Sequence, residues 1–351
     1  MPDATVSVLM PVRNEGSFIE HSLGAVLAQD YPTEHLEIIV ADGMSTDSTR
    51  QIVAQVALDR HNVRLIENPG QIVATGLNKA LKVATGEIIV RVDGHTVIHP
   101  DYVRECVTAL HVSAADNVGG RMQAVSDTWF GRAVAAATSS RFGVGGARFH
   151  YSDREEWVDT VYLGAWRRDV FQRIGTFDEE MVRNQDDEFN YRLRASGGKI
   201  LLSPRIKSKY FNRTSPRALW RQYFQYGYWK VRVLQKHPRQ MQLRQFLPPL
   251  FVFAFLSLLA VIPFANGFWV LLTAGLFAYG LVALVASVAA SVRGEWQLLP
   301  LVPIAFPIIH FAYGLGWLFG LIRFWNRWAN PFRDEKAAGM SPSIALSADE
   351  D

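Results

Sequence analysis

A carboxylate and an imidazole stand two residues apart at Asp93 and His95, directly after the apolar run 88–92. The run is rich in β-branched residues, which is typical of a strand buried on both faces, and ligands of open α/β sheets bind at the carboxyl ends of such strands. Both side chains fall on one side of an extended chain, and Gly94 allows a ligand to approach the backbone. Asp93 and His95 could therefore hold a divalent metal that bridges two phosphates. An ordinary polar turn after a core strand is the alternative.

Two further polar loops follow apolar strands, at Pro11-Val12-Arg13-Asn14-Glu15 and at Asp42-Gly43. Apolar runs alternate with helical periods at residues 6–10, 37–40, 63–66 and 88–92. This alternation predicts βαβ units and a parallel sheet, so the loops should converge on one crevice. The chain has neither a glycine-rich dinucleotide turn nor a Walker lysine motif. Carboxylates and an amide fit a uridine-like base and ribose better, with the diphosphate neutralised by metal.

A second cluster of carboxylates, Asp186, Asp187 and Glu188, opens the helical pattern 189–195. The helix dipole favours acidic residues in a first turn, so the cluster needs no chemical role. Beside a nucleotide crevice, however, such a carboxylate could take the proton from an attacking hydroxyl. Between the clusters, residues 117–125 and 158–163 predict strands. The glycine-rich stretch 128–150 predicts a loop that either lies in solvent or covers the substrate.

Charge is distributed unevenly along the 351 residues. Residues 1–188 carry 27 acidic and 17 basic side chains, whereas residues 189–245 carry 14 basic and no acidic ones. The basic segment predicts a surface that meets anionic lipid or phosphate, with nucleic acid as the competing partner. Met1-Pro2-Asp3 leads directly into a predicted strand, so we expect no signal peptide, and the single cysteine, Cys106, is typical of a cytoplasmic domain.

The sequence after the basic segment favours the membrane over nucleic acid. Residues 246–292 contain 47 residues without a charge, which is room for two spans of about 20 residues with a break at 263–267. A third uncharged run, 296–322, is interrupted by three prolines. Three crossings would place the basic residues at 323–336 on the far side, against the positive-inside tendency. Two crossings and a proline-broken re-entrant segment would keep them cytoplasmic.

Residues 215–234 predict an amphipathic helix. Ser215 can cap it and Pro216 suits its first turn, while apolar and aromatic side chains recur at helical spacing with Arg217, Arg221 and Lys230 between them. This pattern predicts a helix in a membrane interface. A helix packed on a soluble core is the alternative.

Taken in order, the motifs resemble family 2 glycosyltransferases of GT-A fold. The motifs are Pro11-x-x-Asn14-Glu15, Asp42-Gly43-Met44-Ser45-Thr46-Asp47, Gly76-Leu77-Asn78, Val92-Asp93-Gly94-His95, Gly164-Ala165, Gly175-x-Phe177-Asp178-Glu179 and Asp186-x-x-Phe189-x-x-Arg192. The Asp-Gly-His form and the aromatic helix are most similar to the succinoglycan-biosynthesis branch, bacterial membrane enzymes that extend lipid-linked sugars. The resemblance covers residues 5–240.

The resemblance implies an α/β catalytic domain with the GT-A fold, a Rossmann-like mixed sheet, followed by an amphipathic interface helix and transmembrane helices. The implied domains are a glycosyltransferase domain at 1–212, basic interface helices at 213–245, a transmembrane region of two to three segments at 246–323 and a polar tail at 324–351.

The resemblance also implies roles for individual residues. The nucleotide-sugar site would comprise Pro11, Arg13, Asn14, Glu15, Asp42, Asn78 and Asp93, with Asp42 on the uracil and ribose. Asp93 and His95 stand where the family has Asp-x-Asp, which implies Mn²⁺ or Mg²⁺, although the histidine departs from the pattern. Asp186 matches the general base, Gln185 replaces the preceding Glu of the family, and Asp187 and Glu188 are rival bases. The acceptor or its lipid phosphate would meet Gly164, Ala165, Arg217, Arg221 and Lys230.

The expected activity is inverting transfer from a UDP-sugar to a saccharide on a polyprenyl diphosphate, in bacterial polysaccharide synthesis. The catalytic domain would lie on the cytoplasmic face of the inner membrane. Residues 222–226 lack the Gln-x-x-Arg-Trp motif of processive members, which favours a single addition. Direct transfer to a polyprenyl phosphate, as in dolichyl-phosphate mannose synthase-like enzymes, and a non-catalytic membrane scaffold are the alternatives. The expected partners are the UDP-sugar donor, the acceptor and the bilayer, without nucleic acid; assembly into a homo-oligomer stays open.

Overall fold

The structure is a computed structural model, and it describes residues 4–264, 267–292 and 295–328. These residues form two compact units. The α/β unit comprises residues 4–123 and 151–211, and the helical unit comprises residues 124–150 and 212–328. The stretch 124–150, which the sequence placed in the domain 1–212, therefore belongs with the carboxyl-terminal helices.

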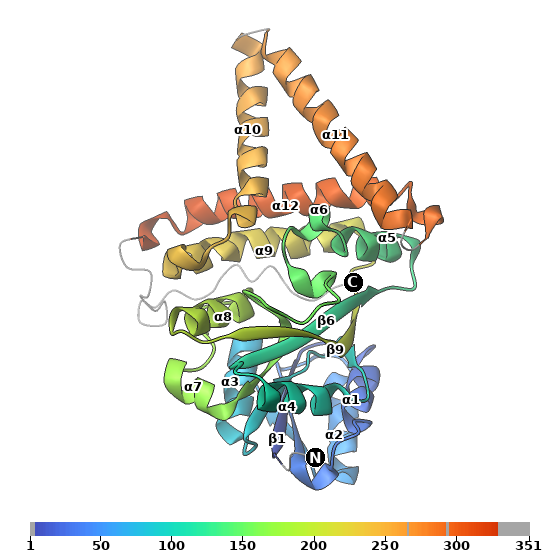
Figure 1. Ribbon diagram of the computed structural model, residues 1–351, viewed down its shortest axis with the longest axis vertical. Coiled ribbons are helices and arrows are strands. Elements are labelled where there is room, and N and C mark those ends of the chain that lie inside the picture. Colours follow the sequence, from blue (N-terminus) through green and yellow to red (C-terminus); the bar gives the residue numbers. More distant parts are fainter. Residues whose placement is uncertain (1–3, 265–266, 293–294, 329–351) are drawn as a thin grey trace. The chain divides into compact units, whose positions relative to one another are not determined.

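The first half of the α/β unit is a regular alternation of strands and helices (Figure 1). It contains β1 (Val6–Val12), α1 (Ile19–Leu27), a 3₁₀ turn (Thr33–His35), β2 (Leu36–Asp42), α2 (Thr49–Asp59), β3 (Val63–Glu67), α3 (Val73–Val83) and β4 (Ile88–Arg91). The strands β1, β2, β3 and β4 are parallel. All seven residues of β1 are buried, as expected for a strand covered on both faces.

The second half of the α/β unit adds antiparallel strands. It contains β5 (Thr96–Ile98), α4 (Tyr102–Val112), β6 (Asn117–Val125), β7 (Glu156–Trp157), β8 (Tyr162–Arg167), α7 (Arg168–Ile174), α8 (Gln185–Ala195) and β9 (Ile200–Phe211). The sheet order is β3-β2-β1-β4-β8-β6-β9-β5, with β7 beside β9. β8 is antiparallel to both β4 and β6, so the sheet is mixed, as the sequence predicted.

One strand prediction in this half was misplaced. The strand expected at 158–163 is replaced by β7, which ends at Trp157, and by β8, which begins at Tyr162. Leu163 and Gly164 have positive φ angles of 62° and 101° within β8, and the β6–β8 register shifts beside them. A bulge of this kind adds a residue to one strand and disturbs the alternation on which strand prediction depends.

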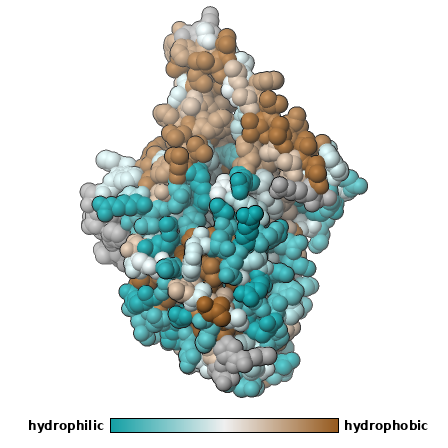
Figure 2. Space-filling view, viewed as in Figure 1, coloured by the Kyte–Doolittle hydropathy of each residue, from teal (hydrophilic) through white to brown (hydrophobic). Residues whose placement is uncertain are grey.

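The helical unit contains α5 (Trp129–Thr138), α6 (Arg141–Val144), α9 (Pro216–Lys236), α10 (Leu247–Val261), α11 (Phe268–Val292) and α12 (Val302–Arg323). Short 3₁₀ turns lie at Arg148–His150, Pro238–Gln240, Leu243–Gln245, Ile262–Phe264, Trp296–Leu298 and Trp325–Arg327. α9 and α12 run side by side, and α10 and α11 extend away from them as a hairpin (Figure 1). Apolar side chains dominate the visible surface of that hairpin (Figure 2).

Three helical segments of this unit are long and apolar enough to cross a membrane: Leu243–Phe264, Phe268–Val292 and Val302–Arg323. The two segments predicted within 246–292 are thus confirmed as helices, and part of the break predicted at 263–267 lies outside the described residues. Of the two alternatives for the third segment, the proline-broken re-entrant element does not describe α12, which continues as one helix through Pro307. Pro303 lies in its first turn, where the missing N–H costs nothing.

The stretch 128–150 is helical where a loop was predicted. The side chains of Thr128 and Ser140 cap α5 and α6 by accepting hydrogen bonds from the N–H groups of Gly131 and Gly143. The buried face of α5 packs with Phe306 and other apolar side chains of α12. Gly143 must be small, because a Cβ there would lie 2.2 Å from the Ala137 carbonyl oxygen. The glycine therefore serves the close packing of helices, whereas a glycine-rich composition by itself is also typical of a loop.

Candidate active site

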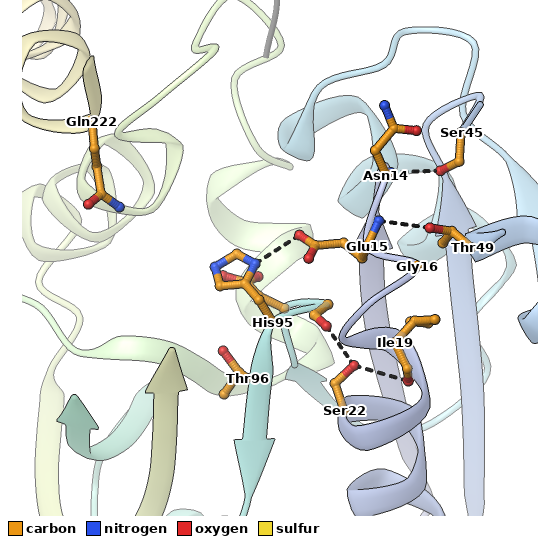
Figure 3. A network of polar contacts seen from close by, with 12 residues as sticks. Asn14, Glu15, Gly16, Ile19, Ser22, Ser45, Thr49, His95, Thr96 and Gln222 are labelled. Carbon is orange, nitrogen blue, oxygen red and sulfur yellow. Dashed lines mark hydrogen bonds and ion pairs between the residues drawn. The ribbon is translucent and has the colours of Figure 1, made fainter. Parts of the chain in front are cut away.

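The loops after β1 and β2 are joined by hydrogen bonds (Figure 3). The N–H of Asn14 donates to Ser45 Oγ at 2.9 Å, and the N–H of Glu15 donates to Thr49 Oγ1 at 2.7 Å. In return, the N–H of Thr46 donates to Asn14 Oδ1 at 2.8 Å. Asn14 itself adopts a φ angle of 50°, a conformation that asparagine tolerates better than most residues. The two loops consequently behave as one rigid element.

The loops after β1 and β4 are joined through Glu15 and His95. The ring Nδ1 of His95 donates to Glu15 Oε1 at 2.9 Å, and Figure 3 shows the ring directed at that carboxylate. A Cβ on Gly94 would lie 2.9 Å from Glu15 Cγ, so the glycine makes room for this contact. From α1, Ser22 Oγ donates to the Gly94 carbonyl at 2.7 Å. The pairing with Glu15 leaves Nε2 of His95 as the ring atom available for a ligand.

Asp93 is held by a neighbour that the sequence prediction did not include. Arg91, at the end of β4, donates from Nε to Asp93 Oδ1 at 2.7 Å and from Nη2 to Oδ2 at 3.0 Å. Its side chain is only 6% exposed, and its Nη1 is buried without a hydrogen-bond partner among the described residues. Burial lowers the pKa of Arg91, but the attraction of Asp93 and Asp186 outweighs it and holds the pKa above its ordinary value. Arg91 therefore carries a fixed positive charge within electrostatic range of both carboxylates.

The three carboxylates at the start of α8 have different surroundings. Glu188 is 3% exposed and accepts two hydrogen bonds from Arg192, at 3.0 and 2.8 Å. Asp186 Oδ1 accepts from the N–H of Asp187 at 2.9 Å, and both aspartates are partly exposed. Glu188 is therefore committed to an ion pair inside the α/β unit. Asp186 is the member of the cluster that interacts electrostatically with Arg91.

Asp42, at the end of β2, is fully buried in this structure. Its carboxylate accepts hydrogen bonds from the N–H of Ser45 at 3.3 Å and lies 3.6 Å from Nη1 of Arg50. Pro11 pairs with Ala41 in the sheet, and Arg13 Nη1 donates to the Gln71 carbonyl at 3.4 Å. These residues line up along the ends of β1 and β2, where the sequence predicted a nucleotide.

Asn78 has a structural task in α3. Its Nδ2 donates to the Phe177 carbonyl at 2.8 Å and to Glu179 Oε1 at 3.2 Å, while its Oδ1 accepts from the N–H of Phe177 at 2.9 Å. The amide thus brackets the loop before α8 against α3. This arrangement favours positioning of that loop over direct contact with a nucleotide.

The residues predicted to meet the acceptor fall into both units. Gly164 and Ala165 lie inside β8, where both are buried and Ala165 pairs with Val90 and Val118. A Cβ on Gly164 would lie 2.4 Å from the Trp166 ring. In α9 of the helical unit, Arg217 is exposed, Arg221 is partly buried and Lys230 is 5% exposed.

Part of the chain matches a known family model. Residues 7–175 match the model described as "Glycosyl transferase family 2". This segment is a family 2 glycosyltransferase domain. Over 323 residues the chain is 29% identical to the succinoglycan biosynthesis protein ExoA of Rhizobium meliloti (strain 1021), covering 91% of this chain and 96% of that protein.

Two further relatives extend beyond the family 2 domain. The chain is 24% identical over 330 residues to a dolichyl N-acetyl-α-D-glucosaminyl phosphate 3-β-D-2,3-diacetamido-2,3-dideoxy-β-D-glucuronosyltransferase of Methanococcus voltae, covering 91% of this chain and 97% of that one. Among solved structures, the mannosyltransferase PcManGT from Pyrobaculum calidifontis, in complex with GDP-Man and Mn²⁺, matches with a TM-score of 0.56 at 22% identity, covering 93% and 88% of the two chains. The fold of the α/β unit is accordingly the predicted GT-A-like mixed sheet.

The family 2 domain offers a partial metal site. Among the described residues, no group of three His, Cys, Asp or Glu side chains could hold a metal by itself. Asp93 and Nε2 of His95 fit a site that leaves the remaining positions to diphosphate oxygens and water. The bond from His95 Nδ1 to Glu15 supports this fit, because a metal-binding histidine usually donates its other N–H to a carboxylate.

Two residues of the domain escaped the sequence analysis: Arg91 and Tyr162. Arg91 gave a usable signal, because a charge inside the apolar run 88–92 must find a partner when it is buried. Tyr162 shares a 2.5 Å hydrogen bond with Thr96 and interacts electrostatically with Asp93. Its contacts come from strands far apart in sequence, so no local pattern reveals them.

Glu15→Ala should weaken metal binding. Loss of the carboxylate frees the His95 ring to rotate, and loss of such a partner typically costs 10- to 100-fold in metal affinity. Calorimetric titration of Mn²⁺ into the purified chain with UDP present would measure the change. Glu20→Ala, at an exposed site on α1, is the matched control. An unchanged Mn²⁺ affinity in Glu15→Ala would rule out this role for the His95–Glu15 pair.

Proposed function

We propose that the protein is an inverting glycosyltransferase that moves one sugar from a UDP-sugar to a saccharide carried on a polyprenyl diphosphate. The observation that carries the proposal is the interlocking of the loops after β1, β2 and β4 in a family 2 domain, with Asp186 in electrostatic range of the Arg91–Asp93 pair. Ligands of open α/β sheets bind at this edge of the strands.

In this proposal the donor lies along the ends of β1, β2 and β4. The loop 11–15 and Asp42 recognise the base and ribose. The diphosphate lies at Asp93 and His95, where a divalent cation, Mn²⁺ or Mg²⁺, would neutralise the charge of the departing UDP. Glu15 fixes the His95 ring, and Arg91 fixes both oxygens of Asp93. Arg91 also supplies a permanent positive charge to the same region.

In the transfer step, Asp186 acts as the general base. The acceptor hydroxyl oxygen forms a bond to the anomeric carbon while the bond from that carbon to the diphosphate oxygen breaks. The hydroxyl proton passes to the Asp186 carboxylate, and UDP leaves with the electron pair of the broken bond. Attack on the face opposite the diphosphate inverts the anomeric configuration. Asp187 is the rival base, whereas the ion pair with Arg192 makes Glu188 a poor candidate.

The acceptor is assigned from the helical unit and from the relatives. Long apolar helices support a location at a bilayer, where a polyprenyl chain resides. The name of the Methanococcus voltae relative describes transfer to a dolichyl-linked sugar phosphate. Arg217 and Arg221 of α9 would meet the lipid phosphates at the cytoplasmic face of the membrane, whereas the burial of Lys230 argues against this role for it. Gly164 and Ala165, being buried in β8, would shape the acceptor side only through the backbone.

A donor and acceptor screen tests the proposal. Membranes containing the protein would be given radiolabelled UDP-sugars or GDP-sugars, together with either bare polyprenyl phosphate or a polyprenyl-diphosphate-linked sugar. Transfer from a UDP-sugar to the sugar-bearing lipid is the expected result. Transfer only to bare lipid phosphate would show the alternative polyprenyl-phosphate glycosyltransferase, and transfer only from GDP-sugars would overturn the donor assignment. The absence of any transfer would favour the scaffold.

A further inference from the structure

Among the residues that the structure describes, three helical segments have the length and hydropathy of membrane spans, but their surroundings differ. The most apolar stretch of each segment is buried inside the protein to a different extent. The buried share is 17% for Leu243–Phe264, 11% for Phe268–Val292 and 44% for Val302–Arg323. The first two therefore present apolar side chains in nearly all directions, as lipid-surrounded helices do. α12 instead has one face covered by protein.

α9 and α12 are packed with their backbones in contact. A Cβ on Gly227 would lie 2.0 Å from the Tyr313 carbonyl oxygen, and a Cβ on Gly316 would lie 2.0 Å from the Phe224 carbonyl oxygen. A Cβ on Gly320 would lie 2.6 Å from the Tyr228 carbonyl oxygen. Small residues at a helix interface allow this close approach. Because their backbones are in contact, α9 and α12 cannot tilt independently of each other.

The contacts advance together along both helices, so the pair is parallel. Phe224 meets Gly316, and Tyr228 meets Gly320. Further toward the carboxyl ends of both helices, Gln235 Nε2 donates to the Phe324 carbonyl at 2.8 Å. At the other end, Leu219 belongs to the same buried cluster as Ala305 and Phe306. Contact thus extends over most of the length of α9.

The charge of α9 prevents the pair from crossing a membrane. Its 21 residues include Arg217, Arg221, Lys230, Arg232 and Lys236 and no acidic residue. Arginine and lysine are costly within a span, and α9 carries five along its length, of which Arg217 and Arg221 are not buried in the protein. Any tilt that carried α12 across the bilayer would carry α9 with it. α12 is accordingly apolar enough to span a membrane, but its packing on the charged helix α9 prevents it from crossing.

We propose that α12 lies along the membrane surface beside α9, and that α10 and α11 alone cross the bilayer. The exposed face of α12, with Ile304, Phe319 and Ile322, would then rest on the acyl chains. Trp325 and Trp328, both exposed just after α12, suit the headgroup level. The partner of this α9–α12 surface is the lipid bilayer itself.

The hairpin dimensions agree with this arrangement. At 1.5 Å per residue, the 22 residues of Leu243–Phe264 and the 25 of Phe268–Val292 reach about 33 and 37 Å, enough for a hydrocarbon core of about 30 Å. Arg244 lies in the 3₁₀ turn before α10 and Arg293 follows α11 in the sequence, with no charge between them. An even number of crossings returns the chain to the side from which it started. Arg323, Arg327 and the tail then share a side with α9, as the positive-inside tendency favours.

Cysteine labelling tests this arrangement without requiring activity. In a Cys106→Ala background, single cysteines would be placed before α9 (Arg213→Cys), at the hairpin tip (Gly267→Cys) and after α12 (Asn326→Cys). All three positions are exposed, and a Cβ at Gly267 meets nothing within 4 Å. A membrane-impermeant maleimide would then be applied to right-side-out and inside-out vesicles, with each variant fully labelled in detergent as the control.

The expected result is labelling of Arg213→Cys and Asn326→Cys from one side and of Gly267→Cys from the other, each with at least a tenfold preference. Labelling of Asn326→Cys from the side opposite Arg213→Cys would establish three crossings and overturn the proposal. Labelling of all three from one side would show that the hairpin does not cross and would also overturn it. Trp328→Cys provides a second reporter after α12 should Asn326→Cys fail to accumulate.

Discussion

Asp186→Asn is expected to lower kcat by about 10²- to 10⁴-fold, the usual contribution of a positioned general base. The amide is nearly isosteric with the carboxylate but cannot accept the hydroxyl proton. Because the side chain keeps its place at the start of α8, the dissociation constant for the UDP-sugar should stay within a factor of about three. Initial rates at saturating donor and acceptor, with donor affinity measured separately by calorimetry, give the two quantities.

Two control variants separate Asp186 from its neighbours. Asp187→Asn should retain most of the activity if Asp186 is the base, since it removes the adjacent carboxylate and leaves Asp186 in place. Glu188→Gln should lower stability instead of turnover, because it breaks a buried ion pair with Arg192. Full activity of Asp186→Asn, with loss in Asp187→Asn, would transfer the role of base to Asp187.

Arg91→Met should cost about 3–5 kcal/mol of unfolding free energy and abolish measurable transfer. The methionine fills much of the space of the arginine, but it leaves Asp93, 13% exposed, as an unpaired charge in the interior. Urea unfolding of the detergent-solubilised chain would give the stability change. Arg64→Met is the matched control, because Arg64 is exposed on β3 and should change stability by less than about 0.5 kcal/mol.

A second substitution distinguishes the two effects of Arg91. In the double variant Arg91→Met with Asp93→Leu no buried charge remains, so most of the lost stability should return. Activity should not return, because the carboxylate proposed to meet the diphosphate is gone. If Arg91→Met unfolded at the wild-type urea midpoint, the buried Arg91–Asp93 pair would not be the organising contact of this region.

The first half of the α/β unit was predictable because its signals are local. Four apolar runs bounded by polar loops each became a parallel strand, with boundaries that differ by two residues or fewer at β1 and β2. The antiparallel half was less accessible. β9 was not predicted, although it extends over Ile200–Phe211, because its partners β5 and β7 are distant in sequence and its pattern of burial alternates only in part.

The candidate site shows the same division between local and tertiary information. The loops carrying Asn14, Asp42, Asp93 and Asp186 could be found from strand ends and helix starts. Their mutual contacts could not, since Glu15 and His95 are 80 residues apart and only the folded sheet brings them together. Asn78 shows how a motif position can also have a structural task. Its amide brackets the loop at Phe177, and nucleotide binding by Asn78 stays a prediction.

In the helical unit, hydropathy identified the helices but not their orientation. α12 and α11 have similar apolar composition, yet α12 is packed against α9 through glycine contacts that a hydropathy scan does not detect. The stretch 128–150 was misread for a related reason. Its alanines and glycines form the packing faces of α5 and α6, and small residues are equally common in loops.

The central claim is that sugar passes from a nucleotide donor to a lipid-linked acceptor on the Asp93–Asp186 side of the α/β unit. The most direct test measures UDP release and label transfer in the same reaction, with a radiolabelled UDP-sugar, a polyprenyl-diphosphate-linked sugar and purified protein. The account predicts one UDP released for each labelled lipid formed, and neither product with Asp186→Asn. UDP release without labelled lipid, or equal formation of both products by wild type and Asp186→Asn, would contradict it.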